Sequence, residues 1–481
     1  MRNYLSFYIN NELVKVDVND SAMTLANYLR KKKSLTGTKI VCAEGDCGAC
    51  TVLIKKPFEE KLPFRSINSC IAPLYLLDSC QVITVEGIEE QQELNEIQTQ
   101  MINHQGSQCG YCTPGFICAL AGMTEEVSIE NKNITEQRIK NHTTGNLCRC
   151  TGYLPIIEAA KNIDLSKIKT FEKRYYQVAK EKLHELAKET IQIEAIEESI
   201  FMPTTLEEAL IYKNTNEALI NSGGTDVGVW INKRDHQAKK VLILNKIQKL
   251  YEYEDNKQFI KIGSKVTIHE AADMMESTFP EFSRKMNIFA SPQIKNKGTI
   301  IGNLANGSPI GDSIPFMLVS DSILNIASVK KNRDLPLKNF YLGYKKFDLA
   351  ENEIITSITI PKTNSDFKLY KVSARKDLDI SSVTMAFRYQ IEHGVFKDLK
   401  IAIGGVGPTV YINEDIESRF LNQPFEISII EEMANEYLSK ITPMSDLRGS
   451  AKFRKIVVKN LFCKFFDEVY LTTHSNSEAC I

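Results

Sequence analysis

The sequence predicts a multidomain α+β protein. Its 481 residues are enough for about three or four domains. Alternating patterns typical of short strands fill the first 86 residues, a helical period follows, and mixed strands and helices resume after residue 200. The cysteines mark the same division, because ten of the twelve lie from Cys42 to Cys150. The first third of the chain therefore has a different task from the rest.

The composition is that of an ordinary globular protein, with 43% hydrophobic and 25% charged residues. A formal net charge of −1 gives no whole-chain attraction to nucleic acid or acidic lipid. No apolar run reaches the roughly 18 residues of a membrane span, and the N-terminus lacks a signal-peptide pattern. We therefore expect a cytoplasmic protein, whose cysteines stay reduced instead of forming disulfides.

The first two regions differ in period. Strand-like patterns cover residues 7–9, 13–18, 51–54 and 82–85, and a short helical pattern covers residues 24–29. Residues 95–165 have a helical period, with Pro114 and Pro155 each placed to begin a helix. The sequence therefore predicts a strand-rich region followed by a helical one.

The remaining chain begins with a polar connector. Residues 166–200 are rich in Lys and Glu and lack Gly and Pro, so we interpret them as a linker that contains a solvated helix at 173–189. A helix is expected at 206–210, and a helical tail at 429–470. Strands are expected at 218–220, 241–244, 259–262, 354–360 and 399–403.

The first cysteine set has the spacing C-x4-C-x2-C, formed by Cys42, Cys47 and Cys50, and Cys70 follows nineteen residues later. This is the plant-type ferredoxin spacing for a [2Fe–2S] cluster. The intervening residues are mostly small, which lets backbone N–H groups approach the sulfurs. A structural zinc site is the alternative, but zinc is usually held by two short cysteine hooks.

The second set consists of two such hooks, Cys109 with Cys112 and Cys148 with Cys150. Each hook precedes an expected helix, so two helix N-termini would face one metal site and favour an anionic thiolate cluster. Zinc remains a stronger rival here, because two hooks of this kind also suit zinc. Cys80, Cys118 and Cys463 are expected to be structural, and Cys480 to have no role.

Two glycine-containing stretches indicate an anion site. Gly223 and Gly224 follow an expected strand, and their N–H groups can approach a pyrophosphate as a nest. The second stretch, from Ala290 to Asp312, is rich in small residues that form hydrogen bonds. A phosphate and a ribityl chain together would use many of them.

Three strings carry a resemblance to a known family: residues 45–52, 108–115 and 145–153. They resemble the cluster loops of the molybdenum hydroxylases, the family of the xanthine dehydrogenases and aldehyde oxidases. The resemblance extends past residue 200 and implies four domains. These are a β-grasp ferredoxin-like domain (1–86), a helical [2Fe–2S] domain (87–165), a vanillyl-alcohol-oxidase-type FAD domain (201–365) after the linker at 166–200, and a CO dehydrogenase flavoprotein C-terminal domain (366–475).

The same resemblance implies the residues that contact FAD. These are Ile220, Asn221, Ser222, Gly223, Gly224, Thr225, Asp226, Val227, Phe289, Ala290, Thr299, Gly302, Asn303, Asn306, Asp312, Ile355 and Lys371. Core packing is the alternative for Phe289, and a solvated surface position is the alternative for Lys371. Leu378 stands where relatives usually carry an acidic residue, in a loop where NAD would approach.

The resemblance also implies a role. Electrons would pass from a molybdopterin subunit that oxidises hypoxanthine or xanthine, through two [2Fe–2S] clusters and FAD, to NAD. Fused members of the family continue into a molybdopterin domain, so we expect a separate large subunit and two copies of each chain. No general acid or base is expected on this chain. The alternatives are the same role in an aldehyde or N-heterocycle dehydrogenase, a stand-alone iron–sulfur flavoprotein reductase, oxygen or a carrier protein as the acceptor, and a zinc-stabilised binding module.

Overall fold

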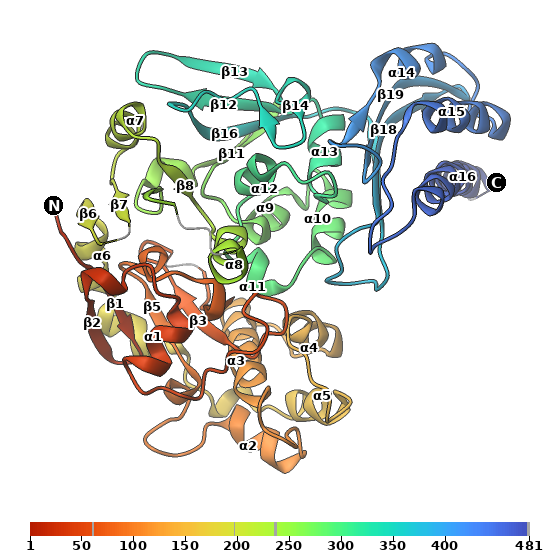
Figure 1. The fold of residues 1–481 in the computed structure, drawn as a ribbon. Helices are drawn as coiled ribbons and strands as arrows, with labels where there is room; N and C mark the ends of the chain where they lie inside the picture. Colours follow the sequence, from red (N-terminus) through yellow and green to blue (C-terminus); the bar gives the residue numbers. More distant parts are fainter. Residues whose placement is uncertain (60–61, 197, 235–237, 479–481) are drawn as a thin grey trace. The chain divides into compact units, whose positions relative to one another are not determined.

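The computed structural model describes residues 1–59, 62–196, 198–234 and 238–478 (Figure 1). The chain forms two compact units. The first comprises Met1–Lys249 and Ser291–Thr299, and the second comprises Leu250–Ala290 and Ile300–Ile481. Each unit is described by itself.

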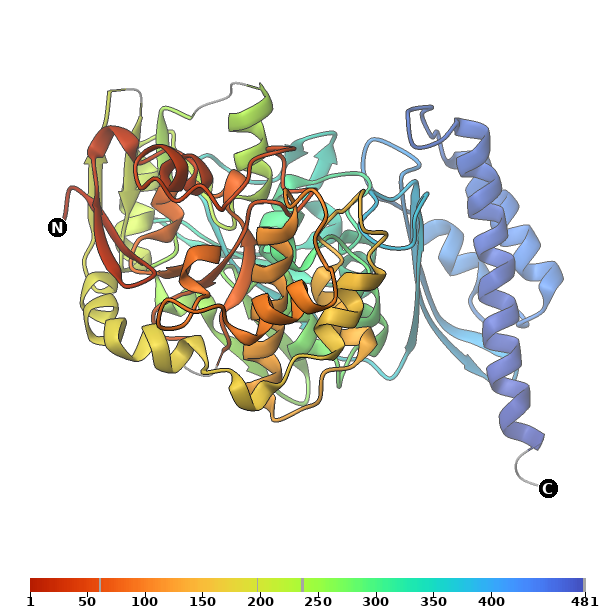
Figure 2. The same cartoon turned by 90° about the horizontal axis from the view of Figure 1, so that it is seen from below.

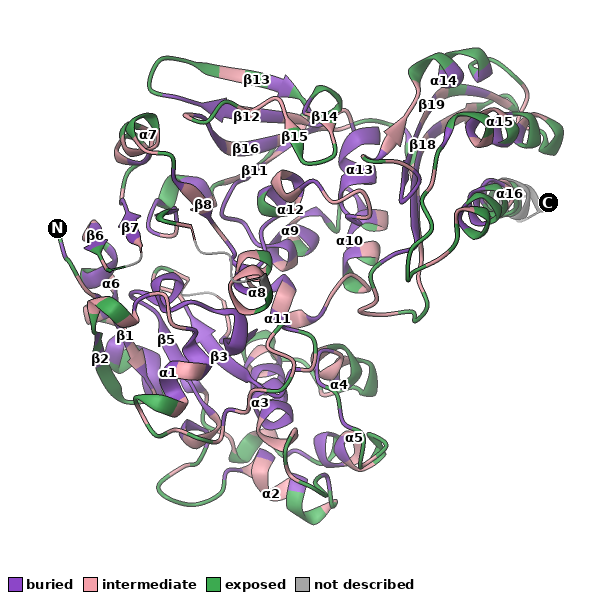
Figure 3. Ribbon diagram, in the orientation of Figure 1, coloured by how far each residue is buried: buried purple, intermediate pink, exposed green. Residues whose placement is uncertain are grey.

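The first unit opens with a five-stranded sheet of order β2-β1-β5-β3-β4. Its strands are β1 Leu5–Ile9, β2 Glu12–Val16, β3 Thr51–Lys55, β4 Arg65–Asn68 and β5 Gln81–Ile83. The hairpin β1–β2 is antiparallel, whereas β1 and β5 run parallel. Helix α1, Leu25–Lys31, begins where the Thr24 hydroxyl caps it. Figure 3 shows β3 and β5 buried, and this sheet confirms the predicted ferredoxin-like fold.

A group of four helices follows, as predicted: α2 Glu96–Asn103, α3 Thr113–Glu130, α4 Glu136–Thr143 and α5 Leu154–Lys161. Helix α3 is apolar nearly all round and packs against β3, so it forms the core of this region. Pro114 and Pro155 lie in the first turns of α3 and α5, where proline has no N–H to lose. The helix α3 ends at Asn131, which adopts the left-handed conformation.

The segment interpreted as a solvated connector is packed instead. A π-helical turn at Glu172–Tyr176 leads into α6, Gln177–Ala187. Tyr176, Leu183 and Leu186 bury one face of it. The Lys and Glu residues that suggested solvation occupy only the other face, so charge density concealed an amphipathic pattern.

A second sheet of the first unit has the order β6-β7-β9-β8. Its strands are β6 Ile191–Glu194, β7 Ser199–Met202, β8 Leu219–Asn221 and β9 Lys240–Ile243, and β9 runs parallel to both β7 and β8. Its helices are α7 Leu206–Thr215 and α8 Thr225–Arg234, and the short α11, Pro292–Lys295, also belongs to this unit. Strands β6 and β7 begin inside the expected linker.

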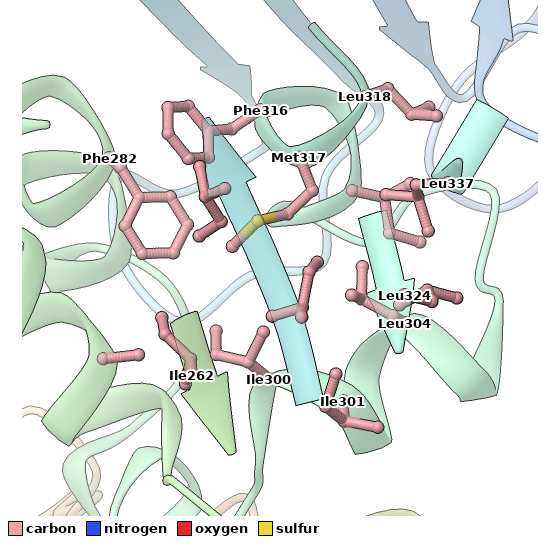
Figure 4. Packing of buried hydrophobic residues seen from close by; sticks show 14 of the residues in the cluster. Ile262, Phe282, Ile300, Ile301, Leu304, Phe316, Met317, Leu318, Leu324 and Leu337 are labelled. Atoms are coloured by element: carbon pink, nitrogen blue, oxygen red, sulfur yellow. The ribbon is translucent and has the colours of Figure 1, made fainter. Parts of the chain in front are cut away.

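The second unit contains a five-stranded antiparallel sheet of order β10-β11-β16-β12-β13. The strands are β10 Tyr253–Asp255, β11 Phe259–Gly263, β12 Ile323–Ala327, β13 Asn332–Pro336 and β16 Ile354–Pro361, with a small hairpin of β14 Tyr341–Gly343 and β15 Lys346–Phe347. The helices are α9 Ile268–Met275, α10 Pro280–Asn287, α12 Ile300–Asn306 and α13 Ile314–Val319. In Figure 4 the Phe282 and Phe316 rings, 4.7 Å apart, lie with aliphatic side chains of this core.

The last region is a four-stranded sheet of order β17-β18-β19-β20. Its strands are β17 Asp366–Val372, β18 Val383–Glu392, β19 Val395–Gly404 and β20 Tyr411–Ile412; its helices are α14 Glu414–Phe420, α15 Ile427–Lys440 and α16 Ala451–Glu478. Helices α15 and α16 pack on this sheet, and Figure 2 shows α16 as one long helix. The Phe387 and Phe465 rings stack at 4.1 Å between β18 and α16.

Candidate redox centres

The first cysteine loop gathers its four thiols. The Cys42 thiol meets those of Cys47 and Cys70, which lower its pKa, and the Cys50 thiol meets that of Cys70, which lowers the Cys50 pKa. The N–H groups of Asp46 and Cys47 point at the Cys42 sulfur, at 3.4 and 3.5 Å. Two backbone donors therefore point at this sulfur, an arrangement that would stabilise a thiolate ligand of an iron–sulfur cluster.

The loop depends on glycine at one position. Gly48 has a φ of +68°, and a Cβ atom there would lie 2.2 Å from the Gly145 carbonyl oxygen. No side chain fits that approach. The loop is held further by Asn68, whose Nδ2 donates to the Gly45 carbonyl at 2.5 Å.

The second set joins its two hooks in cross pairs. The Cys112 thiol meets that of Cys148, and the Cys109 thiol meets that of Cys150. Burial and then the Cys148 thiol raise the pKa of Cys112 to about 12. Burial opposes the ionisation of Cys148, but the Thr151 hydroxyl and N–H, 3.0 and 3.5 Å from its sulfur, outweigh burial and lower its pKa.

Both sets fit the group that the spacing predicts. A [2Fe–2S] cluster takes four cysteines, two for each iron, and each set presents four thiols that approach one another in pairs. Among the described residues, no three His, Cys, Asp or Glu side chains are placed to ligate one ion.

The two sets differ in exposure. Cys50 and Cys70 are buried, whereas Cys109 and Cys150 are exposed. Helix α3 begins directly after Cys112 and α5 begins four residues after Cys150, so each hook precedes a helix N-terminus, as predicted.

The two cysteine loops are in direct contact within the first unit. The Leu147 N–H donates to the Cys47 carbonyl at 3.0 Å. Asn146 Nδ2 donates to the Gly48 carbonyl at 3.0 Å. A Cβ atom on Gly115 would lie 2.3 Å from that same carbonyl oxygen. The predicted ligand Cys47 is therefore hydrogen-bonded to the residue that directly precedes Cys148, a predicted ligand of the second set.

The other cysteines lie apart from both sets. Cys80 and Cys118 are buried in apolar clusters, and burial raises the pKa of Cys80 to about 12. Cys463 is partly exposed on α16. Cys480 lies outside the described residues.

The glycine pair follows a strand and precedes a helix. Ser222, Gly223 and Gly224 connect β8 to α8, which begins with Thr225, Asp226 and Val227. Gly223 passes so close to residue 297 that a Cβ atom would lie 2.3 Å from the Lys297 carbonyl oxygen. In the same unit, Thr299 Oγ1 lies 3.4 Å from Ser222 Oγ, and Asn221 Nδ2 donates to the Tyr75 hydroxyl at 3.1 Å. This strand–turn–helix geometry places the N–H groups of the turn at a helix N-terminus, a position suited to a phosphate.

Helix α8 also touches the first cysteine loop. Asn232 Nδ2 donates to the Cys70 carbonyl at 2.7 Å and to the Ala43 carbonyl at 2.9 Å. Sequence reasoning missed this role, because one asparagine 162 positions from its partner has no local pattern.

The remaining expected flavin residues lie in the second unit. Gly302, Asn303 and Asn306 are on α12, where Asn303 accepts from Ser313 Oγ at 2.6 Å. Ile355 is buried on β16. Phe289 packs partly buried against the core, which is the alternative foreseen for it, and Ala290 has a φ of +47°.

Lys371 is not a surface residue. Its Nζ lies 2.5 Å from the Asp312 carboxylate, with both side chains at most 3% exposed. The same Nζ donates to the Asp379 carbonyl at 2.8 Å and to Ser381 Oγ at 2.9 Å. This ion pair fastens the loop that contains Leu378, whose φ of +68° is rare for a branched residue.

Four family models match the chain in succession. They are the 2Fe-2S iron-sulfur cluster binding domain at residues 7–75, the [2Fe-2S] binding domain at 84–161, the FAD binding domain in molybdopterin dehydrogenase at 192–363, and the CO dehydrogenase flavoprotein C-terminal domain at 368–469. The chain thus has two [2Fe–2S] domains and an FAD-binding domain.

Curated relatives are xanthine dehydrogenases. The protein of Emericella nidulans is 27% identical over 97% of this chain, and xanthine dehydrogenase 1 of Arabidopsis thaliana is 28% identical over 92%. The chain spans 38% of the length of each. The class is an iron–sulfur flavoprotein, and within that class the chain matches the iron–sulfur and flavin part of the molybdenum hydroxylases.

Solved structures share the fold of part of the chain. A carbon monoxide dehydrogenase from Hydrogenophaga pseudoflava matches with a TM-score of 0.52 and 21% identity, over 55% of this chain and 93% of that one. Quinoline 2-oxidoreductase from Pseudomonas putida 86 matches with a TM-score of 0.52 and 20% identity, over 56% and 94%.

Proposed function

We propose that the chain is the electron-transfer subunit of a xanthine dehydrogenase. It would pass electrons from a molybdopterin subunit that oxidises hypoxanthine or xanthine, through two [2Fe–2S] clusters and FAD, to NAD. The observation that carries the proposal is an unbroken series of contacts in the first unit. The second cysteine loop bonds to the first through Leu147 and Cys47, and the first bonds through Cys70 to Asn232 of the helix after the glycine turn.

The chain's own residues bind and orient the redox groups. The eight ligands would be Cys42, Cys47, Cys50, Cys70, Cys109, Cys112, Cys148 and Cys150. FAD would be held by Ile220, Asn221, Ser222, Gly223, Gly224, Thr225, Asp226, Val227, Phe289, Ala290, Thr299, Gly302, Asn303, Asn306, Asp312, Ile355 and Lys371. When bound, these groups supply one-electron carriers and a two-electron donor to NAD. The thiolates are stabilised by backbone donors, and the glycine turn by the start of α8 supplies N–H groups for a pyrophosphate.

The second cysteine site supplies a face for the partner. Around the exposed Cys109 and Cys150 stand apolar side chains that are themselves exposed: Tyr111, Leu147, Tyr153 and Leu154. Aromatic and aliphatic residues at a rim suit a protein interface. We therefore place the molybdopterin subunit here, in an assembly with two copies of each chain.

Another molybdenum hydroxylase is the second candidate function. The solved structures that share the fold act on other substrates by their printed names, carbon monoxide and quinoline. By the resemblance of the sequence, Leu378 also stands where an acidic residue is expected. Oxygen or a carrier protein would then replace NAD.

The test is purification of the tagged chain from its native host. A large molybdenum-containing partner and hypoxanthine-dependent reduction of NAD support the proposal. Activity with an aldehyde or an N-heterocycle alone would favour the second candidate. A chain that emerges alone and reduces dyes fully with NADH would overturn both. No helix among the described residues is long and apolar enough to cross a membrane; we propose a cytoplasmic location.

A further inference from the structure

Three buried polar side chains from distant parts of the first unit meet at one point. Gln293 Nε2 donates to Asn146 Oδ1 at 2.8 Å and to Thr51 Oγ1 at 3.2 Å. Asn146 Nδ2 lies 3.3 Å from the same Thr51 oxygen. All three side chains are at most 2% exposed. They are 95 to 242 positions apart in sequence, so only the fold brings them together.

Each side chain belongs to a different structural element. Thr51 directly follows Cys50 of the first set, and Asn146 comes two residues before Cys148 of the second set. Gln293 lies on α11 (Figure 1). This helix is tied to β4 by the Asn296 Nδ2 bond to the Ser66 carbonyl at 2.9 Å. The group therefore spans both cysteine loops and one further segment of the unit.

The group converges on the Gly48 carbonyl, which lies between two predicted ligands. Thr51 Oγ1 donates to it at 2.6 Å and Asn146 Nδ2 at 3.0 Å. Gln293 donates to both of these side chains. It therefore orients the two donors that bind the Gly48 carbonyl of the first cysteine loop. A networked group of this kind tolerates only one arrangement of its members.

One polar atom of Gln293 lowers the stability of the fold. Its Oε1 is buried without a hydrogen-bond partner among the described residues, and a buried unsatisfied oxygen typically costs about 1–3 kcal/mol. A Cβ atom on residue 145 would lie 2.0 Å from that oxygen, so Gly145 must also be glycine. Against this cost stand the two bonds from its Nε2, which hold the Asn146 and Thr51 side chains in place.

We propose that Gln293 is a positioning residue that sets the spacing of the two iron–sulfur loops and thereby the rate of electron transfer between them. This rests on the two clusters of the proposed function. Replacing Gln293 leaves all eight cysteines in place but frees Asn146 and Thr51 to rotate. Because electron tunnelling slows as the two carriers move apart, the electron-transfer rate between the clusters falls several-fold.

The test uses the complex purified from its native host, with the variants Gln293→Met and Gln293→Glu. Both keep the length of the side chain and remove its N–H donors. The matched control is Gln81→Met, which removes the N–H donors of another buried glutamine of the first unit, bonded to the Asn10 and Val82 carbonyls, without touching either cysteine loop. The readouts are iron and acid-labile sulfide content, the magnetic interaction between the two reduced clusters by electron paramagnetic resonance, and the rate at which one cluster reduces the other.

The expected result is full iron content, an altered magnetic interaction and a slowed rate in both Gln293 variants, with the control like the wild type. Unchanged interaction and rate would overturn the inference. Loss of the clusters themselves in both variants would overturn it too, because Gln293 would then support the folding of the loops and not their spacing. A wild-type protein without iron or sulfide would instead refute the proposed function, so the two failures are distinct.

Discussion

The two cysteine sites use the same ligands in opposite settings. In the first, one loop and a distant cysteine place Cys50 and Cys70 inside the unit, and its backbone is bonded on both sides, to Leu147 and to Asn232. In the second, two hooks at two helix N-termini leave Cys109 and Cys150 exposed. A buried site with neighbours on both sides suits an internal relay. An exposed site with an apolar rim suits exchange with another protein.

The largest effect should come from the buried site. Replacing Cys47 by Ser removes a predicted ligand of the first cluster, so purine-dependent NAD reduction should be abolished while NADH-driven dye reduction through FAD persists. Cys463→Ser, at a partly exposed position on α16, is the control and should keep full activity. Purine-to-NAD turnover at the wild-type rate in the Cys47 variant would refute the relay role of this site.

The sequence predicted the gathering of the cysteines and the helices beside them better than it predicted the contacts around them. Both cysteine sets and the helices after Cys112 and Cys150 follow from local spacing and from proline placement, which act within a few residues. The packed face of α6 was missed because its charged residues dominate the composition. Asn146, Asn232 and Gln293 were missed for another reason. Their partners are set by long-range packing, and a carboxamide can pair with any backbone group that the fold presents.

Ion pairs near the two sites should also differ in what they contribute to the free energy of unfolding: a buried one near the first site should contribute much more than an exposed one near the second. Asp78 lies beside the first sheet with its carboxylate fully buried, 2.9 Å from Arg2 and 2.7 Å from Lys246. Burial opposes its ionisation, but Lys246 and Arg2 outweigh burial and lower its pKa. Asp78→Asn should therefore lower the free energy of unfolding by about 3–5 kcal/mol, measured by urea denaturation near neutral pH.

The stability of Asp78→Asn should depend on pH, and a variant of an exposed ion pair serves as its control. Because the folded-state pKa of Asp78 is lowered, its contribution is present above the unfolded pKa and is lost as pH falls through the folded value. The wild type and Asp78→Asn should thus converge in acid. Lys161→Ala, which breaks the exposed pair with Glu136 near the second site, should leave the unfolding midpoint unchanged. Equal losses of unfolding free energy in Asp78→Asn and Lys161→Ala would show that the buried and the exposed ion pair contribute alike.

A single charge on the proposed partner surface around Cys109 and Cys150 should weaken binding of the partner. Leu154 begins α5 and is 64% exposed beside the second set. Leu154→Asp should weaken binding of the molybdopterin subunit by roughly ten-fold or more, as expected for loss of an interface anchor, with the unfolding midpoint unchanged. Ile211→Asp, on α7 and 53% exposed, is the matched control. Equal affinity of the two variants in a titration of the partner would place the interface elsewhere.

The smallest effect concerns the far end of the helix that begins at the second site. Glu125 of α3 is buried and accepts a short hydrogen bond from the Phe171 N–H. Burial raises its pKa to about 7. The folded state therefore retains a proton that the unfolded state releases near its ordinary pKa, so stability falls as pH rises from about 4.5 to about 7. Glu125→Gln keeps the acceptor and cannot ionise. It should raise the free energy of unfolding at pH 8 by about 1–2 kcal/mol relative to wild type and leave it unchanged at pH 4.5. Parallel pH profiles for the two proteins would mean that ionisation of Glu125 does not destabilise the folded state. The two sites would then differ only in the burial of their cysteines.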